Sequence, residues 1–227
     1  MTQAVYATPT LPLALDGLGR NTTCQYPILC DWQLLNTTKG NDVIIVVVLG
    51  DQPISIIDSS GLSFSQRLSY TTSGLSEYYA RATSPLRSDN ITVIGSPFTQ
   101  VLAISGANTR AIFDPNPSIP AMCSQPNCGD CTVYYGTCSV SMQTSTIDFV
   151  VATTAINDAG ACGGYLGSFG GVPGFTTITT NNGYSGNFEI DYTITAMPQT
   201  KVVFNCNGTE ATEIVVDAIS FRGAFGI

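Results

Sequence analysis

The chain consists of short segments of strand length separated by turns, and no ten-residue window has a convincing helical period. Residues 188–196 show the pattern most clearly, with apolar side chains at Phe188, Ile190, Tyr192 and Ile194. A period of two is typical of a strand that buries one face. The sequence therefore predicts an all-β protein.

Similar segments recur at roughly 10–15-residue spacing. We expect strands at 26–35, 42–50, 54–58, 63–70, 77–83, 90–94, 100–105, 146–154, 175–180, 188–196, 201–206 and 213–222. No break in composition and no internal repeat is visible, and the 227 residues suit a jelly roll better than a seven-stranded immunoglobulin domain. We therefore expect a single jelly-roll-like β-sandwich over residues 20–227, with residues 1–19 forming an N-terminal donor or edge strand and a hinge.

Two stretches break the strand pattern. Residues 108–140 hold four prolines and four cysteines, and we expect a disulfide-rich excursion there. Residues 160–174 hold seven glycines, and we expect a long surface loop.

Composition excludes several classes of function. The net charge of −8 argues against nucleic-acid binding, which needs a basic surface. The chain has no histidine, so it cannot use a histidine base or metal ligand of its own. It has no nucleophile elbow or P-loop, and no apolar run approaches the 18 residues of a membrane span. We expect no enzyme, no cofactor and no metal.

The cysteine count is even, at eight, which favours four disulfides in an oxidising compartment. We expect Cys24 to pair with Cys30, Cys162 with Cys206, and the remaining four among themselves: Cys123, Cys128, Cys131 and Cys138. The alternative for this cluster is zinc, but only its central pair has the short spacing of a zinc knuckle.

Four N-glycosylation sequons are present, at Asn21, Asn36, Asn90 and Asn207. They fit an extracellular or cell-surface glycoprotein carrying N-linked glycans. Residues 1–20 have neither a charged n-region nor an unbroken apolar core, so we expect the sequence to start at the mature protein or to lack its export signal.

The N-terminal segment, residues 2–15, has a strand-like pattern and no obvious hairpin partner. Its apolar positions are Val5, Ala7, Leu11, Leu13 and Leu15. One interpretation is an edge strand of its own sandwich. The other is a donor strand that completes the sheet of a neighbouring copy. Pro9 and Pro12 lack amide protons and interrupt pairing in either case.

Two segments are apolar on both faces, Val43–Leu49 and residues 213–222. The outer face of a sandwich normally becomes polar where it meets water. We therefore expect a cover over these faces, either a loop or another subunit. A head-to-tail contact between subunits would not close, and would produce a fibre.

Several apolar strand segments form a recurring pattern, namely DVIIVVVLG, ISIIDSSGLSFSQRLSY, SEYYARATSPLRSDNITV, IDFVVATTAI and TEIVVDAISFRG. In these segments the chain resembles jelly-roll modules of secreted prokaryotic surface proteins. In architecture it is also similar to extracellular filament subunits that assemble by donor-strand exchange, such as chaperone–usher pilins and archaeal thread-like or bundling pili. The matching features are the apolar N-terminal strand, one all-β domain, few charges, cysteines and sequons. This similarity implies a structural function.

Several polar residues could carry chemistry. Glu189 and Asp191 lie on one strand face at a separation that could serve glycoside hydrolysis, but we expect that face to be solvated. Asp148 and Asp217 interrupt apolar strands, and we expect each to pair with an arginine such as Arg67 or to line a calcium site.

Exposed aromatic side chains could instead bind surface carbohydrate, and the candidates are Tyr78, Tyr79, Tyr134, Tyr135 and Trp32. Our leading hypothesis is a subunit of an extracellular homopolymeric filament, a head-to-tail polymer of this chain. In it, the N-terminal strand enters the next copy's sandwich. The alternative is a monomeric carbohydrate-binding or adhesive module.

Overall fold

The computed structural model describes residues 12–23, 30–50, 54–70, 74–96, 98–124, 137–156, 162–167, 174–183, 186–207 and 211–223. These ranges contain seventeen strands and no helix, which confirms the all-β class. Among the same residues, no helix is long and apolar enough to cross a membrane.

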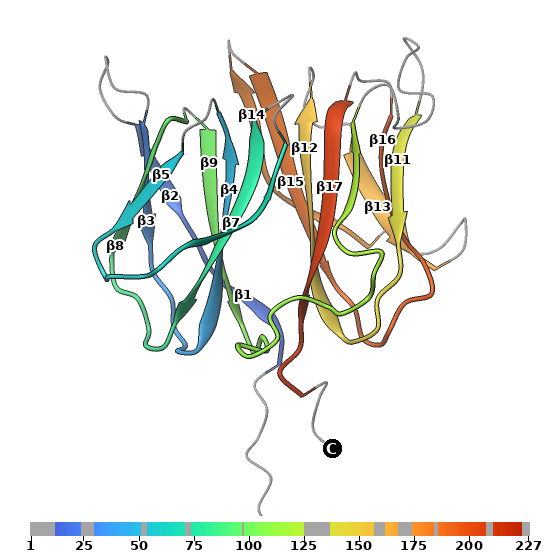
Figure 1. Ribbon diagram of the computed structural model, residues 1–227, viewed down its shortest axis with the longest axis horizontal. Coiled ribbons are helices and arrows are strands. Elements are labelled where there is room, and N and C mark those ends of the chain that lie inside the picture. The colour runs from blue at the N-terminus through green and yellow to red at the C-terminus, as the bar shows by residue number, and fades with distance from the viewer. Residues whose placement is uncertain are drawn as a thin grey trace, which may run out of the picture.

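The strands form four antiparallel sheets that lie in four layers, from left to right in Figure 1. In the N-terminal half the outer sheet has the order β2-β3-β8-β5 and the inner sheet has the order β1-β9-β4-β7-β6. Their bounds are β1 Ala14–Leu18, β2 Arg20–Thr23, β3 Cys30–Leu35, β4 Asp42–Leu49, β5 Ser55–Asp58, β6 Ser65–Ser69, β7 Leu75–Ala82, β8 Asp89–Ile94 and β9 Phe98–Ser105.

In the C-terminal half the inner sheet has the order β10-β17-β12-β15-β14 and the outer sheet has the order β11-β16-β13. Their bounds are β10 Ala121–Ser124, β11 Thr137–Met142, β12 Asp148–Ile156, β13 Cys162–Leu166, β14 Thr176–Gly183, β15 Gly186–Ile194, β16 Val202–Asn207 and β17 Ala211–Ser220. Each of the twelve expected strand segments overlaps one of the observed strands.

Three apolar clusters separate the four layers, and the two inner sheets are therefore covered on both faces. On β4, Val43 and Ile45 pack between the inner sheets, whereas Ile44 packs against the N-terminal outer sheet. The same alternation on β17 places Val215 between the inner sheets and Val216 against the C-terminal outer sheet. The cover expected over the doubly apolar strands is therefore the chain's own sheets, and not a loop or another subunit.

The two halves have the same topology. Every described strand except β2 has a counterpart in the other half. The inner sheets align as β1-β9-β4-β7-β6 with β10-β17-β12-β15-β14, and the outer sheets align as β3-β8-β5 with β11-β16-β13. The expectation of a single sandwich without an internal repeat is wrong, because the chain forms two equivalent sandwiches joined through their inner sheets. The repeat is barely visible in the sequence: the matched strands β9 and β17 share only Val-x-Ala-Ile-Ser, at 101–105 and 216–220.

Hydrogen bonds repeat where the topology repeats. Thr37 Oγ1 accepts from the amide of Leu86 at 2.9 Å, and Thr144 Oγ1 accepts from the amide of Gln199 at 2.9 Å. Each hydroxyl also donates to the carbonyl two residues ahead in its own turn. These turns lead into β4 and β12, the central strands of the inner sheets, so the same local structure starts both strands.

Two local expectations are wrong, the hinge and the glycine-rich loop, whereas the disulfide-rich excursion holds in part, since Cys123 and Cys138 are disulfide-bonded. The hinge expected at residues 16–19 lies largely within β1, and the irregular stretch 108–140 contains β10 and part of β11. The expected loop 160–174 contains β13, which pairs with β16. A side chain at Gly164 would lie 2.3 Å from the Val203 carbonyl oxygen, so glycine here permits close strand packing and does not mark a loop.

Candidate functional site

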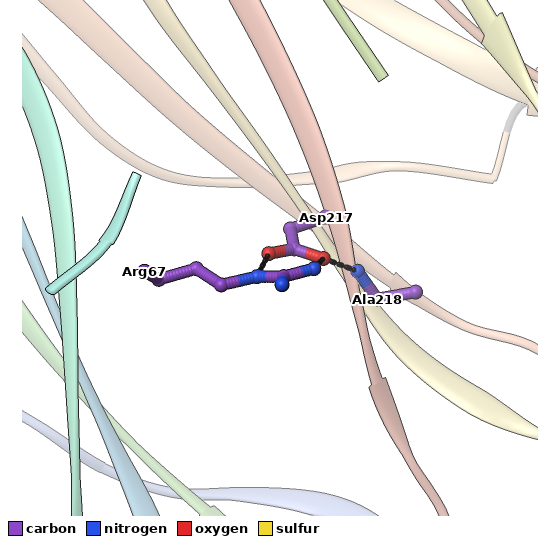
Figure 2. A network of polar contacts seen from close by, with 3 residues as sticks. All are labelled: Arg67, Asp217 and Ala218. Carbon is purple, nitrogen blue, oxygen red and sulfur yellow. Dashed lines mark hydrogen bonds and ion pairs between the residues drawn. The ribbon is translucent and has the colours of Figure 1, made fainter. Parts of the chain in front are cut away.

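A polar cluster lies between the two halves, inside the otherwise apolar contact of the inner sheets. Arg67 of β6 meets Asp217 of β17 through two contacts, Nε to Oδ2 at 2.7 Å and Nη2 to Oδ1 at 3.2 Å (Figure 2). The amide of Ala218 donates to the same carboxylate at 2.8 Å. The guanidinium carbon also lies 3.9 Å from the ring centroid of Phe113. The cluster therefore ties the N-terminal half to the C-terminal half.

Burial controls the protonation of this cluster. Asp217 is fully buried, and burial raises the pKa of its carboxyl although the contacts with Arg67 oppose the rise. Burial also raises the pKa of the Glu77 carboxyl well above its usual value, and the charge of Asp217 adds to the effect. Burial therefore disfavours the ionised form of both carboxyls, and the contacts with Arg67 favour the ionised form of Asp217. The expected pairing of Asp217 with an arginine is confirmed.

A second set of acidic residues is duplicated with the fold. Asp16 accepts the amides of Thr38 and Lys39 at 2.7 and 2.8 Å, and Asp114 accepts those of Ser145 and Thr146 at 2.7 and 2.9 Å. Each carboxylate therefore closes the turn that leads into the central strand of its half. This role of Asp16 and Asp114 was not predicted from the sequence.

Beside each of these carboxylates lies a buried aspartate that begins the central strand. Burial raises the pKa of Asp42 to about 7, and the neighbouring charge of Asp16 contributes. Burial likewise raises the pKa of Asp148 to about 7, and Asp114 contributes. Asp148 thus pairs with a second carboxyl and with the Thr146 hydroxyl at 2.6 Å, so its expected pairing with an arginine is wrong. The signal was an aspartate directly before each apolar strand.

Glu189 and Asp191 do share a strand face, but that face is not solvated. Each is 1% exposed, because this face of β15 lies on the side of the C-terminal outer sheet. Burial raises the pKa of Asp191 to about 7, although the Thr177 hydroxyl donates a hydrogen bond of 2.6 Å to this carboxylate, which opposes the rise. The pair resembles a glycosidase pair in spacing only, since a substrate would have no access to it.

The described surface includes two hollows with described lining residues. One of about 620 Å³ runs beside β1, and its lining includes Leu18, Arg20 and Ile178. The other, of about 390 Å³, includes Arg110 and Arg222. Neither brings two carboxylates together among its described lining residues. Within the described ranges, no group of three or more metal-ligating side chains could hold a metal ion.

The aromatic residues considered for sugar binding divide into two groups. Tyr78 and Tyr79 are partly buried and pack against the apolar clusters on either side of β7. Trp32, on β3, is 43% exposed. Tyr134 and Tyr135 lie outside the described residues.

The expected donor residues also divide into two groups. Leu13 is buried in the cluster between the inner sheets, and Leu15 packs against it. The strand that contains Leu15, β1, pairs with β9 of the same chain. Leu13 and Leu15 are therefore part of the chain's own core and are not available for donation. Val5, Ala7 and Leu11 lie outside the described residues.

The outer sheets differ in one strand. In the N-terminal half, β2 pairs with β3 along one edge of the sheet. In the C-terminal half, the counterpart of β3 is β11, which pairs with β16 on one side. No described strand pairs with the other side of β11. Within the described part of the chain, this edge is the place where one sandwich has a strand and its equivalent has none.

The disulfide predicted between Cys162 and Cys206 is confirmed, and it joins β13 to β16. Cys123 and Cys138 are also disulfide-bonded, and no cysteine among the described residues is free. Cys30 begins β3, and Cys24, Cys128 and Cys131 lie outside the described residues.

Of the four sequon asparagines, Asn36 is exposed, and its Oδ1 accepts the amide of Ser88 at 2.8 Å. Asn90 is half-buried on β8. Asn21 lies in β2 and Asn207 in β16.

Comparisons with family models, with curated proteins and with solved structures found no match for this chain. Its function must therefore be argued from the residues and geometry described above.

Proposed function

We propose that this chain is a structural subunit of an extracellular homopolymeric filament, in which residues 2–11 of one copy complete the C-terminal outer sheet of the next. The observation that supports the proposal is the mismatch between the two outer sheets: β3 has β2 along its second edge, and no described strand lies along that edge of β11. Strand addition takes place at a sheet edge, where the incoming strand takes up backbone amides and carbonyls.

The donor segment fits this edge in length and in chemistry. Thr2–Thr8 is free of proline, and its seven residues are enough to pair with the six of β11. Residues 2–11 carry no charged side chain, so no charge would need to be desolvated in the contact. The donor is shorter than the 2–15 expected from sequence, because Leu13 and Leu15 belong to the chain's own core. The oxidised cysteines support an oxidising, extracellular location.

A chain lacking residues 2–11 tests the proposal. Leu13 and β1 remain, so we expect a folded monomer that forms no fibres by electron microscopy, while the full chain forms them. A synthetic peptide of residues 2–11 should bind the truncated chain, and a peptide with Val5→Asp and Ala7→Asp should not. Fibres from the truncated chain, or no fibres from the full chain, would refute strand donation.

One observation favours a second candidate, a carbohydrate-binding surface module. Trp32 presents an exposed indole on a sheet face, and indole faces stack on sugar rings. Binding of neutral oligosaccharides that depends on Trp32 would support this candidate, whether or not the chain polymerises.

A further inference from the structure

A hollow of about 390 Å³ lies where the two halves of the chain meet. The amide of Asn108 donates to the Ser220 carbonyl at 2.8 Å, and the amide of Arg222 donates to the Gly106 carbonyl at 2.9 Å. These bonds join the segment that follows β9 to the end of β17, and β9 and β17 are equivalent strands of the two halves. The residues that line the hollow therefore follow the ends of two equivalent strands, one in each half.

The described side chains that line this hollow supply positive charge and hydrogen-bond donors but no carboxylate. They belong to Asn108, Thr109, Arg110, Ala111 and Arg222, and both arginines are exposed. We call this set the arginine hollow. The chain has only eight basic residues against sixteen acidic ones, so two arginines at one hollow concentrate its scarce positive charge. A guanidinium presents its N–H groups as a planar fork that matches the oxygens of a carboxylate or phosphate.

No described carboxylate neutralises these two arginines. Among the described residues, the one ion pair joins Arg67 to Asp217. Asp217 is the nearest acidic residue to Arg222 along the chain, so that carboxylate is already engaged. The nearest one to Arg110 is Asp114, whose carboxylate accepts amides of the turn that leads into β12. Like charges at one hollow repel each other, and an anion bound there would offset this repulsion.

Asn108 contributes a further donor to the lining. Its side chain is 8% exposed, and its Oδ1 accepts the amides of Arg110 and Ala111 at 3.1 and 3.2 Å. Only the oxygen of a carboxamide accepts hydrogen bonds, so these two bonds fix which way the amide group faces. Among the described residues, none accepts a hydrogen bond from the other atom of this amide, Nδ2. A donor on a side chain that is more than nine-tenths buried costs free energy when it has no acceptor, and a bound oxyanion would supply one.

We infer that the arginine hollow binds an oxyanion, namely a carboxylate, phosphate or sulfate group, through Arg110, Arg222 and the Nδ2 of Asn108. Its volume lies near the lower limit of small-molecule sites, which is about 300 Å³. The hollow therefore has room for a free inorganic anion or for a small acidic saccharide, and the two share this chemistry. Because both arginines are exposed to solvent, the affinity is modest and falls as the ionic strength rises. The site does not depend on filament formation, since all three residues belong to one copy.

Isothermal titration calorimetry of the full chain, at low and constant ionic strength, tests the site with phosphate, acetate and glucuronate. We expect saturable binding that Arg110→Gln and Arg222→Gln each weaken at least about tenfold, since each variant removes a charge-assisted hydrogen bond. Arg81→Gln removes the same charge from an exposed position on β7 and should leave binding unchanged. Asn108→Asp keeps the oxygen that accepts the two amides and replaces Nδ2 by an anionic oxygen, so it should preserve the turn and abolish binding.

The comparison of ligands identifies the source of the oxyanion. Glucuronate that binds more tightly than acetate, which carries the same carboxylate, would identify an acidic saccharide, and otherwise the ligand is the free anion. Three results would overturn the inference: none of the three anions binds, the two arginine variants bind as tightly as the parent chain, or Arg81→Gln weakens binding as much as they do. The last result would show a general effect of net charge and no site.

Discussion

Replacing Arg67 by Met removes the cation that lies between the two halves and leaves its partner in place. Asp217 would then be a fully buried carboxylate next to Glu77, with only the Ala218 amide as a described hydrogen-bond donor. Breaking a buried ion pair in this way costs about 3–5 kcal/mol of the free energy of unfolding. We expect a loss of this size at pH 7, against well under about 1 kcal/mol for Arg81→Met, since Arg81 is exposed.

The loss should depend on pH, and its sign follows from Asp217. Without Arg67 the folded-state pKa of Asp217 rises further above its ordinary value of 3.8, because burial is no longer opposed. A raised folded-state pKa stabilises the protein below the unfolded-state value, and this stabilisation is lost as the pH rises through the folded-state value. The Arg67→Met variant should therefore approach the parent chain in stability near pH 4 and differ most at pH 7 and above.

Urea unfolding followed by circular dichroism and by the emission of Trp32 measures both effects. The double variant Arg67→Met with Asp217→Leu removes the charge together with its partner, and should regain most of the loss. The reasoning is refuted if Arg67→Met costs less than about 1 kcal/mol at pH 7, or if the double variant is as unstable as the single one.

Three further predictions concern stability. Burial raises the folded-state pKa of Asp148 from 3.8 to about 7, so this group should lower the free energy of unfolding by about 1.4 kcal/mol per pH unit between about pH 4 and 7. In Asp148→Asn, the plot of unfolding free energy against pH, measured with urea, should lose this slope. Removing the disulfide by Cys162→Ala with Cys206→Ala should cost about 4 kcal/mol in the chain-entropy model for a 44-residue separation, measured by urea unfolding under oxidising conditions. Phe149→Ala should cost about 3–5 kcal/mol and leave one thermal transition for both halves, whereas two transitions would show that the inner-sheet contact does not couple them.

Strand content was predictable because the alternation of side chains is local. The strand expected at 188–196 overlaps β15, which runs from Gly186 to Ile194, and the inward face at Phe188 and Ile190 was predicted correctly. Its second face was not, because the pattern shows that Glu189 and Asp191 differ from their neighbours but not what lies opposite them. Carboxyls on a strand usually meet water, and here another sheet lies over that face.

The number of layers was harder to predict than the number of strands. The doubly apolar β4 correctly indicated a cover on both faces, but one strand does not reveal whether the cover belongs to its own chain or to another. Knowledge of the duplication would have shown that the cover belongs to the same chain. The duplication is visible in equivalent hydrogen bonds of Thr37 and Thr144, which a local sequence pattern does not reveal. The edge of β11 that has no described partner likewise becomes visible only when the two halves are compared strand by strand.

The difference between the two outer sheets gives the molecule a direction. A subunit made of two identical halves could be placed in an assembly in either of two orientations with the same energy. Here the outer sheet at one end has four described strands, and the outer sheet at the other end has three and an edge without a described partner. A single mismatch between duplicated halves is thus enough to distinguish head from tail, so copies added one after another would all point the same way.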